Sequence, residues 1–504
     1  MNELETSRSN KVGLIPEISL VESDEKLELV SEYGRFPVVA PGKGTVRAFR
    51  LLAEGVSTES ELATQVLEAD GIAELTRYQY LFTQCVLRCM VRYRVFDQGF
   101  PVLTFQLTVP QRSFAVESVD ASAYHQLSRF AYSHRESEGM TVETPLFAGK
   151  MLLHDWRTSA LFTMLADRKT AAEVAQGVDF LSADAVAGVL ELMKAARIWN
   201  ACDGGVGDEE SSIPLRQWEF HDLLFHTRSR IGRHNQRVGA TFRHLGQIAP
   251  QPLIKKQEEP AIPLPAPARR GPDEEISIFQ AIEDRHSIRQ HGSEPISLEQ
   301  LSEFLFRVAR IRALWDFEVK NPEGIRIENV ELSNRPYPSG GAIYEMELYL
   351  TVDRCRGLYA GLYRYRPVDH TLVKISDANG KTANLQKDAC MAAGIQQTPQ
   401  VLITLASRFQ RMSWKYAAIS YAATLKNVGV LYQTMYLVAT GMGLAGCALG
   451  SGNSDLFSDA AGTNYYAETS VGEFMLGSAP DKEKLPPWLH EKEMRRNDAL
   501  PILA

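Results

Sequence analysis

The stretch "SWKYAAISYAATLKNVGVLYQTMYLVATGMGLAGCALG" (residues 413–450) has the pattern of one long helix that ends in glycines. Its apolar side chains recur three or four positions apart, as they do on one face of a helix. The residues on this face are Ala417, Tyr421, Leu425, Val428, Tyr432 and Met435. Gly441 is typical of the residue that follows a helix, so the pattern predicts a helix over 414–440.

Lys415 and Tyr416 stand at the predicted start of this helix, where a lysine is unexpected. The free amides of a first helical turn carry partial positive charge, which disfavours the charged form of a lysine. The pKa of Lys415 is therefore expected to fall, and burial would lower it further. The plainer alternative is that the Lys415 ammonium reaches into water while Tyr416 packs.

Helical and strand patterns both surround this segment. Helices are expected over 278–286 and 297–312, and strands over 344–352, 361–366, 400–406 and 471–477. The second half of the chain is therefore predicted to be an α+β domain.

The segment "DRHSIRQHG" (284–292) follows a helical pattern and places Arg285, Ser287 and Arg289 at alternate positions. In an extended chain, these three side chains would point to one side. Two guanidinium groups and a hydroxyl suit a phosphate dianion. The alternative is a helix end with solvated arginines.

Two glycine-rich segments offer close backbone approach to a flat ligand. "YPSGGAIYEMELYL" (337–350) predicts a turn before a strand, and "GMGLAGCALGSGN" (441–453) predicts a helix end and a loop. Taken singly, each segment could be only a turn or a helix cap.

The order of these motifs resembles the nitroreductase-type flavin fold, in which FMN lies between the two subunits of a homodimer. Within that fold, the chain is most similar to the SagB-type peptide dehydrogenases, and it shares the layout of the cyanobactin oxidases. These azoline oxidases convert thiazoline or oxazoline rings of ribosomally made peptides into thiazoles or oxazoles. The resemblance covers residues 276–480, extends to "WEFHDLLFHTRSRIGRH" (218–234), and includes two domains before it.

The resemblance also implies which residues hold FMN. They are Arg285, His286, Ser287, Arg289, Pro338, Ser339, Gly340, Gly341, Gln433, Gly443, Leu444, Ala445, Gly446, Cys447 and Ala448. Simple nitroreductases add a Lys or Arg after the last strand, but Lys482 and Lys484 do not match that position clearly. No metal ligand is expected.

In azoline dehydrogenases, the Lys-Tyr pair that matches Lys415 and Tyr416 is the catalytic signature. Aromatising the ring removes a hydride, which goes to the flavin, and a proton, which needs a base. A neutral Lys415 could take this proton, and the Tyr416 phenol could bond the ring heteroatom or relay the proton; which residue is the base stays open. Because no second nucleotide fingerprint is present, molecular oxygen is the expected electron acceptor.

The first half of the chain contains a weak repeat after a polar leader over 1–30. Each copy reads as helix, short helix, longer helix and wing, and Thr58 with Glu61 and Thr170 with Glu173 cap the short helices. The repeat predicts two winged-helix-like domains, over 31–115 and 116–215. Peptide binding and mere packing are equally good interpretations, and few basic residues in the presumed recognition helices argue against DNA.

A His- and Arg-rich wrapping segment and a proline-rich linker are expected over 216–275, with the main boundary between 250 and 275 and the FMN domain over 276–504. The net charge of −8 gives no general attraction to nucleic acid or anionic lipid. The six scattered cysteines are expected to be buried thiols. Without a signal peptide or a spanning apolar run, a cytoplasmic protein with an azoline-containing precursor peptide as substrate is expected.

Two alternatives compete with this interpretation. An NAD(P)H-dependent nitro- or quinone reductase could use the same fold, but the Lys415–Tyr416 pair and the long N-terminal region argue against it. A non-catalytic leader-peptide-binding protein is also conceivable, but the intact set of Arg285, Ser287 and Arg289 argues against it.

Overall fold

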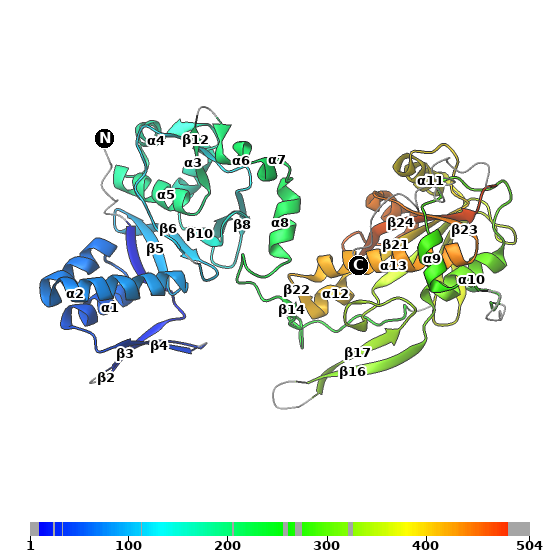
Figure 1. Cartoon of the computed structure of the whole chain (residues 1–504), viewed down its shortest axis with the longest axis horizontal. Helices are drawn as coiled ribbons and strands as arrows, with labels where there is room; N and C mark the ends of the chain where they lie inside the picture. Colours follow the sequence, from blue (N-terminus) through cyan, green and yellow to red (C-terminus); the bar gives the residue numbers. More distant parts are fainter. Residues whose placement is uncertain are drawn as a thin grey trace, which may run out of the picture. The chain divides into compact units, whose positions relative to one another are not determined.

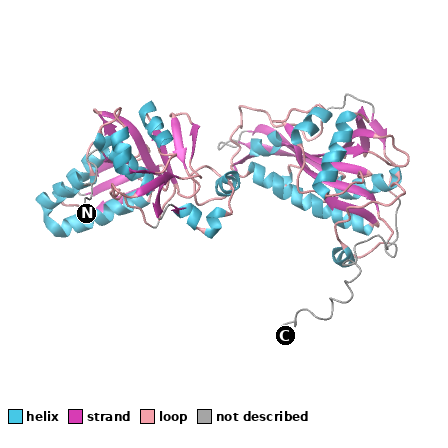
Figure 2. Cartoon of the chain, turned by 90° about the horizontal axis from the view of Figure 1, so that it is seen from above, coloured by secondary structure: helices cyan, strands magenta, loops and turns pink. Residues whose placement is uncertain are grey.

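The computed structural model describes residues 10–23, 26–32, 34–111, 113–203, 206–255, 261–267, 275–320 and 326–481. Residues 1–9 of the predicted leader lie outside this part of the chain, as do Lys482 and Lys484. The chain divides into two compact units, residues 1–236 and 237–504, and each unit mixes helices with strands (Figure 1, Figure 2). The mixed α+β class is as predicted.

The elements of the first unit are mostly short. Its strands are β1 (Asn10–Leu14), β2 (Ser19–Ser23), β3 (Lys26–Ser31), β4 (Gly34–Val39), β5 (Val91–Asp97), β6 (Phe100–Leu107), β7 (Tyr124–Leu127), β8 (Tyr132–Arg135), β9 (Met140–Glu143), β10 (Gly149–Leu153), β11 (Lys169–Thr170), β12 (Trp199–Asp203) and β13 (Val206–Gly207). Its helices are α1 (Lys43–Glu54), α2 (Glu59–Leu87), α3 (Trp156–Met164), α4 (Ala171–Gly177), α5 (Ala183–Ala195), α6 (Asp208–Ser211), α7 (Ile213–Arg216) and α8 (Phe220–Arg228).

A six-stranded sheet in the order β1-β5-β6-β10-β9-β8 joins the two predicted repeats. Strands on both sides of the predicted boundary at 115 and 116 therefore share one sheet and one hydrophobic core. Residues 10–14, which the sequence places in the polar leader, form β1, and Val12 is fully buried against this core. The division between the units follows Gln236, ahead of the predicted boundary between 250 and 275. These differences from the predicted boundaries arise because distant segments pair as strands. A local sequence pattern does not show such pairing.

The helix caps of the repeat are confirmed. Thr58 Oγ1 accepts from Glu61 N at 3.2 Å, and Thr170 Oγ1 accepts from Glu173 N at 3.1 Å. In both cases the glutamate side chain accepts from the threonine backbone amide at 2.7 Å. The chain leaves helical geometry at Gly71 within α2, which separates the predicted short and longer helices.

The second unit contains the predicted FMN-binding region. Its strands are β14 (Gly239–Ala240), β15 (Ala261–Pro263), β16 (Ala313–Lys320), β17 (Arg326–Asn334), β18 (Met346–Val352), β19 (Gly361–Arg366), β20 (Thr371–Asp377), β21 (Val401–Arg408), β22 (Tyr416–Ala417), β23 (Leu444–Ala448) and β24 (Glu468–Ser478). Its helices are α9 (Ile278–Asp284), α10 (Leu298–Ala309), the 3-10 turn η2 (Gly340–Ala342), α11 (Gly380–Ala393), α12 (Phe409–Lys415), α13 (Ser420–Gly441) and α14 (Ser454–Ala461).

A seven-stranded antiparallel sheet, in the order β15-β20-β19-β18-β21-β24-β23, separates two apolar layers of the second unit. Side chains alternate between its faces. Leu348 and Ile403 pack on the side of α10 and α13, whereas Tyr349 and Leu402 pack on the side of α11 and α14. The helix that the opening stretch predicts therefore covers one face of the sheet. In Figure 1 the hairpin of β16 and β17 leaves this body as a long arm.

The predicted helix over 414–440 is wrong at its start and right at its end. Helix α12 ends at Lys415, strand β22 follows, and α13 begins only at Ser420 and ends at Gly441. Ala418 has a left-handed φ of +57°. The cause is tertiary: β14 pairs antiparallel with β22, and Phe242 N donates to Lys415 O at 3.1 Å.

The segment after β14 runs along this break. Trp414 Nε1 donates to Ile248 O at 2.6 Å, and Arg411 Nη1 donates to Gln251 O at 2.6 Å. Among the described residues, no helix is long and apolar enough to cross a membrane.

Candidate functional site

The predicted site residues gather at the two ends of α13. Near its start lie the turn from Ser339 to Gly341 and the pair Lys415 and Tyr416; near its end lie Arg285, Ser287 and strand β23. Asn427 and Tyr436 anchor the two groups on the helix. Asn427 and Tyr436 are nine positions apart, which corresponds to about 13 Å along the helix axis.

Lys415 and Tyr416 both lie against Gly341. Lys415 Nζ donates to Gly341 O at 3.4 Å. A Cβ atom on Gly341 would lie 2.6 Å from Lys415 Nζ and closer still to the Tyr416 hydroxyl. The Phe242 ring also faces the amine, with its centroid 6.0 Å from Nζ. The glycine turn thus contacts the predicted catalytic pair, as it must if the turn and the pair belong to the same site.

Burial lowers the pKa of Lys415 from its ordinary value, so the predicted direction is confirmed. Of the two predicted causes, burial is confirmed and the helix start is wrong, because Lys415 lies in the last turn of α12 and not at the start of α13. A helix C-terminus favours a cation, so the cause of the lowered pKa is burial and not the helix dipole. Burial, followed by the charge of Glu345, raises the pKa of Tyr416. The pair is therefore biased toward a neutral amine and a neutral phenol.

The turn before β18 is held by buried polar groups. Gly340 N donates to Asn427 Oδ1 at 3.0 Å, and Gly341 has a φ of +63°, which favours glycine. Ser339 is half-buried, whereas Pro338 and Gly341 are exposed. The exposed edge of the turn is open to a ligand.

The second group centres on Tyr436. Its hydroxyl lies 2.8 Å from Ser287 Oγ and accepts from Ala448 N at 2.8 Å. The Arg285 guanidinium lies over its ring, 5.3 Å from the centroid. Ile288 N donates to Gly446 O at 3.0 Å, which fixes the extended segment beside β23. Arg285 and Ser287 therefore project to one side, as their spacing predicts.

The donors of this group fit an anion such as the phosphate of FMN. No carboxylate pairs with Arg285 or Arg289 within the part of the chain that the structure describes, and Arg289 is exposed. His286 Nδ1 lies 2.8 Å from Asp284 O, while its Nε2 is buried and has no partner among the described residues. Two uncompensated guanidinium groups and a hydroxyl are suitable ligands for a phosphate.

The remaining predicted residues have different surroundings. The segment from Leu444 to Ala448 is the edge strand β23 and not the predicted loop, because it pairs with β24. Leu444, Ala445, Gly446 and Cys447 are buried, whereas Ala448 is half-buried. Gly443 is exposed and has a φ of +67°, and it takes the helix-ending role predicted for Gly441. Gln433 is exposed on α13.

Three residues of these groups were missed by the sequence reasoning: Glu345, Asn427 and Tyr436. Asn427 is 6% exposed on the same helix face as the core residues Val428 and Leu431. A polar residue inside an apolar stripe needs a buried partner, so this position carried a usable signal. The contacts of Tyr436 depend on chain folding and had no signal of this kind.

Tyr436→Phe is expected to lower the stability of the apoprotein by about 1–3 kcal/mol, because the change leaves the Ala448 amide without its acceptor. Thermal unfolding measures the effect. Tyr359→Phe is the matched control, since that side chain is 87% exposed. Equal melting temperatures for both variants and the parent protein would contradict the role of Tyr436.

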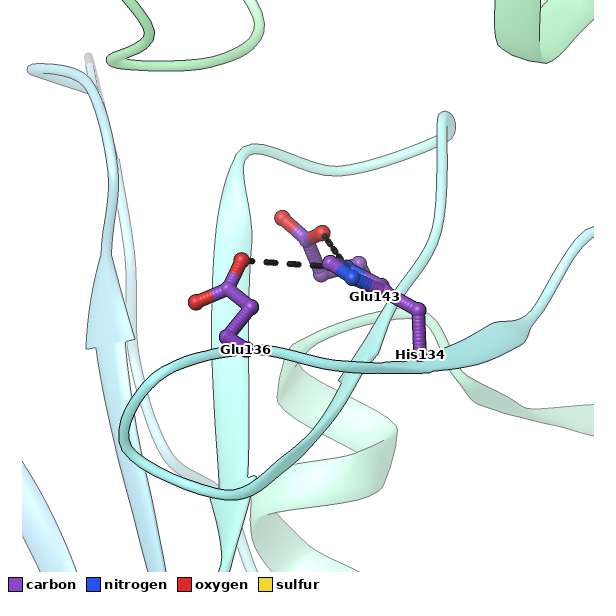
Figure 3. A group of neighbouring side chains, drawn as sticks. All are labelled: His134, Glu136 and Glu143. Atoms are coloured by element: carbon purple, nitrogen blue, oxygen red, sulfur yellow. Dashed lines mark hydrogen bonds and ion pairs between the residues drawn. The ribbon is translucent and has the colours of Figure 1, made fainter.

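A separate cluster in the first unit has the composition of a metal site. His134 Nε2 lies 3.0 Å from Glu143 and 3.8 Å from Glu136 (Figure 3). Cations already balance both carboxylates, because Arg228 pairs with Glu143 at 2.6 Å and Lys150 pairs with Glu136. This cluster therefore joins α8 to the hairpin of β8 and β9 without need of a metal.

Comparisons with known proteins agree with this geometry. Residues 125–235 match the family Cyanobactin oxidase ThcOx, and residues 282–477 match the Nitroreductase family. A protein of Methanocaldococcus jannaschii assigned to the nitroreductases is 30% identical over 178 residues, which are 35% of this chain and 80% of that protein.

Two further proteins are similar to part of this chain. The microcin B17-processing protein McbC of Escherichia coli is 30% identical over 117 residues, which are 22% of this chain and 42% of McbC. A crystal structure of a Ralstonia eutropha protein assigned to the nitroreductases has a TM-score of 0.34 at 20% identity, over 46% of this chain and 96% of that one. The predicted resemblance to nitroreductase-type and cyanobactin-oxidase proteins is confirmed, and the chain belongs to the nitroreductase family.

Proposed function

We propose that this protein is an FMN-dependent dehydrogenase that aromatises thiazoline or oxazoline rings in a ribosomally made precursor peptide. The observation that carries the proposal is the seat of Lys415 and Tyr416 against the Gly341 turn within a nitroreductase domain. The match of residues 125–235 to the cyanobactin oxidases and the similarity to McbC support the substrate class.

Lys415 and Tyr416 carry the proton chemistry in this proposal. The half-buried amine has a lowered pKa, so its neutral form is available to take a proton from the ring carbon. The Tyr416 phenol, whose pKa is raised, stays protonated and can donate a hydrogen bond to the ring heteroatom. In the alternative, Tyr416 is the base and Lys415 donates the hydrogen bond. Mutation of each residue distinguishes the two assignments.

Arg285, Ser287 and Arg289 would hold the FMN phosphate, and the turn from Ser339 to Gly341 would meet the edge of its ring. FMN, when bound, supplies the acceptor for the hydride equivalent that ring oxidation releases. Molecular oxygen is the proposed final acceptor. Pro338 and Gly443 flank these contacts from exposed positions.

A homodimer completes the proposal, because the two groups of site residues lie at opposite ends of α13. This helix exposes Tyr421 and Leu425, which lie four positions apart on one face and are 47% and 38% exposed. Apolar side chains on one helix face favour burial against a second copy. Light scattering of the purified protein measures the mass.

The first unit is proposed to bind the leader part of the precursor peptide through winged-helix-like subdomains over 31–115 and 116–215. Strand β8 ends the six-stranded sheet in the part of the chain that the structure describes, and an edge strand can bind an extended peptide. The cytoplasm is the proposed location.

Mass spectrometry of a purified azoline peptide incubated with the protein tests the reaction. Loss of two hydrogens per ring, with yellow protein that shows FMN absorbance, is the expected result. Rapid bleaching of the flavin by NADPH, with no change in peptide mass, would instead identify a nitro- or quinone reductase. Colourless protein that takes up no FMN would reject both enzymes.

Arg285→Ala and Arg289→Ala are each expected to weaken FMN binding by about 10- to 100-fold, the range for losing a charge-assisted hydrogen bond. Fluorescence titration of the apoprotein with FMN measures the affinity. Arg356→Ala is the control, because Arg356 is an exposed arginine of the same unit outside both groups of site residues. Unchanged FMN affinity in both variants would show that Arg285 and Arg289 do not bind the FMN phosphate.

A further inference from the structure

Two buried side chains and one half-buried side chain form a hydrogen-bonded set under the glycine turn; we name Ser339, Glu345 and Asn427 the turn bracket. Glu345 is 0% exposed and Asn427 is 6% exposed. Asn427 Nδ2 donates to Glu345 Oε1 at 2.8 Å and to Ser339 Oγ at 3.2 Å. Ser339 Oγ donates to Glu345 Oε2 at 3.2 Å.

The direction of these bonds is fixed by the backbone. Asn427 Oδ1 accepts from Gly340 N, so its amide group must face the other two members. Ser339 Oγ accepts from Tyr344 N at 3.1 Å, so its hydrogen is directed to Glu345. Both carboxyl oxygens of Glu345 therefore accept hydrogen bonds, and these bonds act against burial, which raises the pKa of this carboxyl.

The turn bracket connects three elements that together carry the candidate site. Ser339 precedes η2, Glu345 precedes β18, and Asn427 lies in α13. The turn that they hold carries Gly341, whose carbonyl accepts from Lys415 Nζ. Displacement of the turn would therefore move the surface on which Lys415 and Tyr416 rest.

We propose that Ser339, Glu345 and Asn427 are positioning residues that fix the glycine turn for FMN and for the catalytic pair. This inference rests on the proposed function. It assigns the buried carboxylate to preorganisation of the cofactor-binding turn and not to acid–base chemistry, because both of its oxygens are already occupied by donors from the turn bracket.

Glu345→Gln tests the proposal, because every orientation of the new amide leaves one buried donor without an acceptor. FMN affinity of the apoprotein is expected to fall by about 10- to 100-fold. In the double variant Glu345→Gln with Asn427→Asp, the amide and the carboxylate exchange places, so the bond between the two positions re-forms with its direction reversed. The double variant is expected to recover FMN affinity by about 5-fold or more relative to Glu345→Gln.

Thr424→Val is the matched control. Thr424 lies one turn before Asn427 on α13, is 0% exposed, and its hydroxyl has no partner among the described residues. FMN affinity within about 2-fold of the parent is expected for this variant, since no hydrogen bond is lost.

The outcomes separate the inference from the proposed function. A parent protein that binds no FMN overturns the proposed function. A parent that binds FMN, with a Glu345→Gln variant that melts at a lower temperature but binds FMN equally well, overturns the turn bracket alone. If Glu345→Gln does not fold, Ser339→Ala gives the answer, because it keeps the carboxylate: a loss of about 3-fold or more supports the proposal, and unchanged affinity overturns it.

Discussion

Replacement of Lys415 by alanine is expected to lower the turnover of an azoline peptide by about 10²–10⁴-fold, the usual contribution of a positioned base. FMN binding should stay within about 2-fold, because the amine contacts the turn carbonyl at 3.4 Å and none of the predicted phosphate ligands. Single-turnover kinetics, followed by flavin absorbance and peptide mass, measure both quantities.

The control for this change is Lys426→Ala. Lys426 is an exposed lysine of the neighbouring helix α13, so its loss removes the same charge without touching Gly341. Undiminished turnover in Lys415→Ala would end the catalytic assignment. A large loss in Tyr416→Phe together with a small loss in Lys415→Ala would instead make the phenol the base.

The pH dependence gives a second readout of the same assignment. Lysine accepts a proton only when neutral, so turnover should rise as pH rises through the pKa of Lys415 and then level off. Because burial lowers this pKa, the midpoint should lie below the ordinary lysine value of 10.5. The rise should be absent from the residual activity of Lys415→Ala.

Gly341→Ala is expected to lower turnover by about 10²-fold, the cost of a misplacement of about 1 Å in a catalytic group. The added Cβ would lie 2.6 Å from Lys415 Nζ, and the φ of +63° would strain any side chain. The atoms that must move are the ends of two flexible side chains, so the protein should fold while the pair is displaced. Steady-state kinetics and thermal unfolding separate the two effects.

Gly380→Ala is the matched control for the glycine change. Nothing lies within 4 Å of a Cβ at Gly380, and this residue begins α11 on the other face of the sheet. Turnover equal to that of the parent is expected for this variant. If Gly341→Ala also retains full turnover, the close contact of Lys415 and Tyr416 with the Gly341 turn is not needed for catalysis.

Local patterns predicted much of the second unit correctly. Strand β19 occupies the predicted 361–366, and α13 ends at Gly441, one residue after the predicted end at 440. The caps at Thr58 and Thr170 are also as predicted, because a capping box depends only on residues three positions apart. Hydrophobic periodicity and capping act within a few residues, so the chain alone reveals them.

Local sequence patterns did not predict the strand pairing between distant segments. Residues 239–242 pull Tyr416 and Ala417 into a strand and so separate Lys415 from the long helix that its neighbours predict. In the same way, β24 turns the predicted loop at 444–448 into a strand. The local sequence pattern of each segment does not show the strand with which that segment pairs.

The sequence by itself determined the residue types of the candidate site and the class of fold that holds them. Only the tertiary structure decided what lowers the pKa of the lysine: Lys415 is half-buried against the Gly341 turn at the end of α12, and α13 begins five residues further on. The same holds for the turn bracket, whose members lie on three elements. Helix formation depends on near neighbours, whereas the burial of a charge depends on segments that only folding brings together.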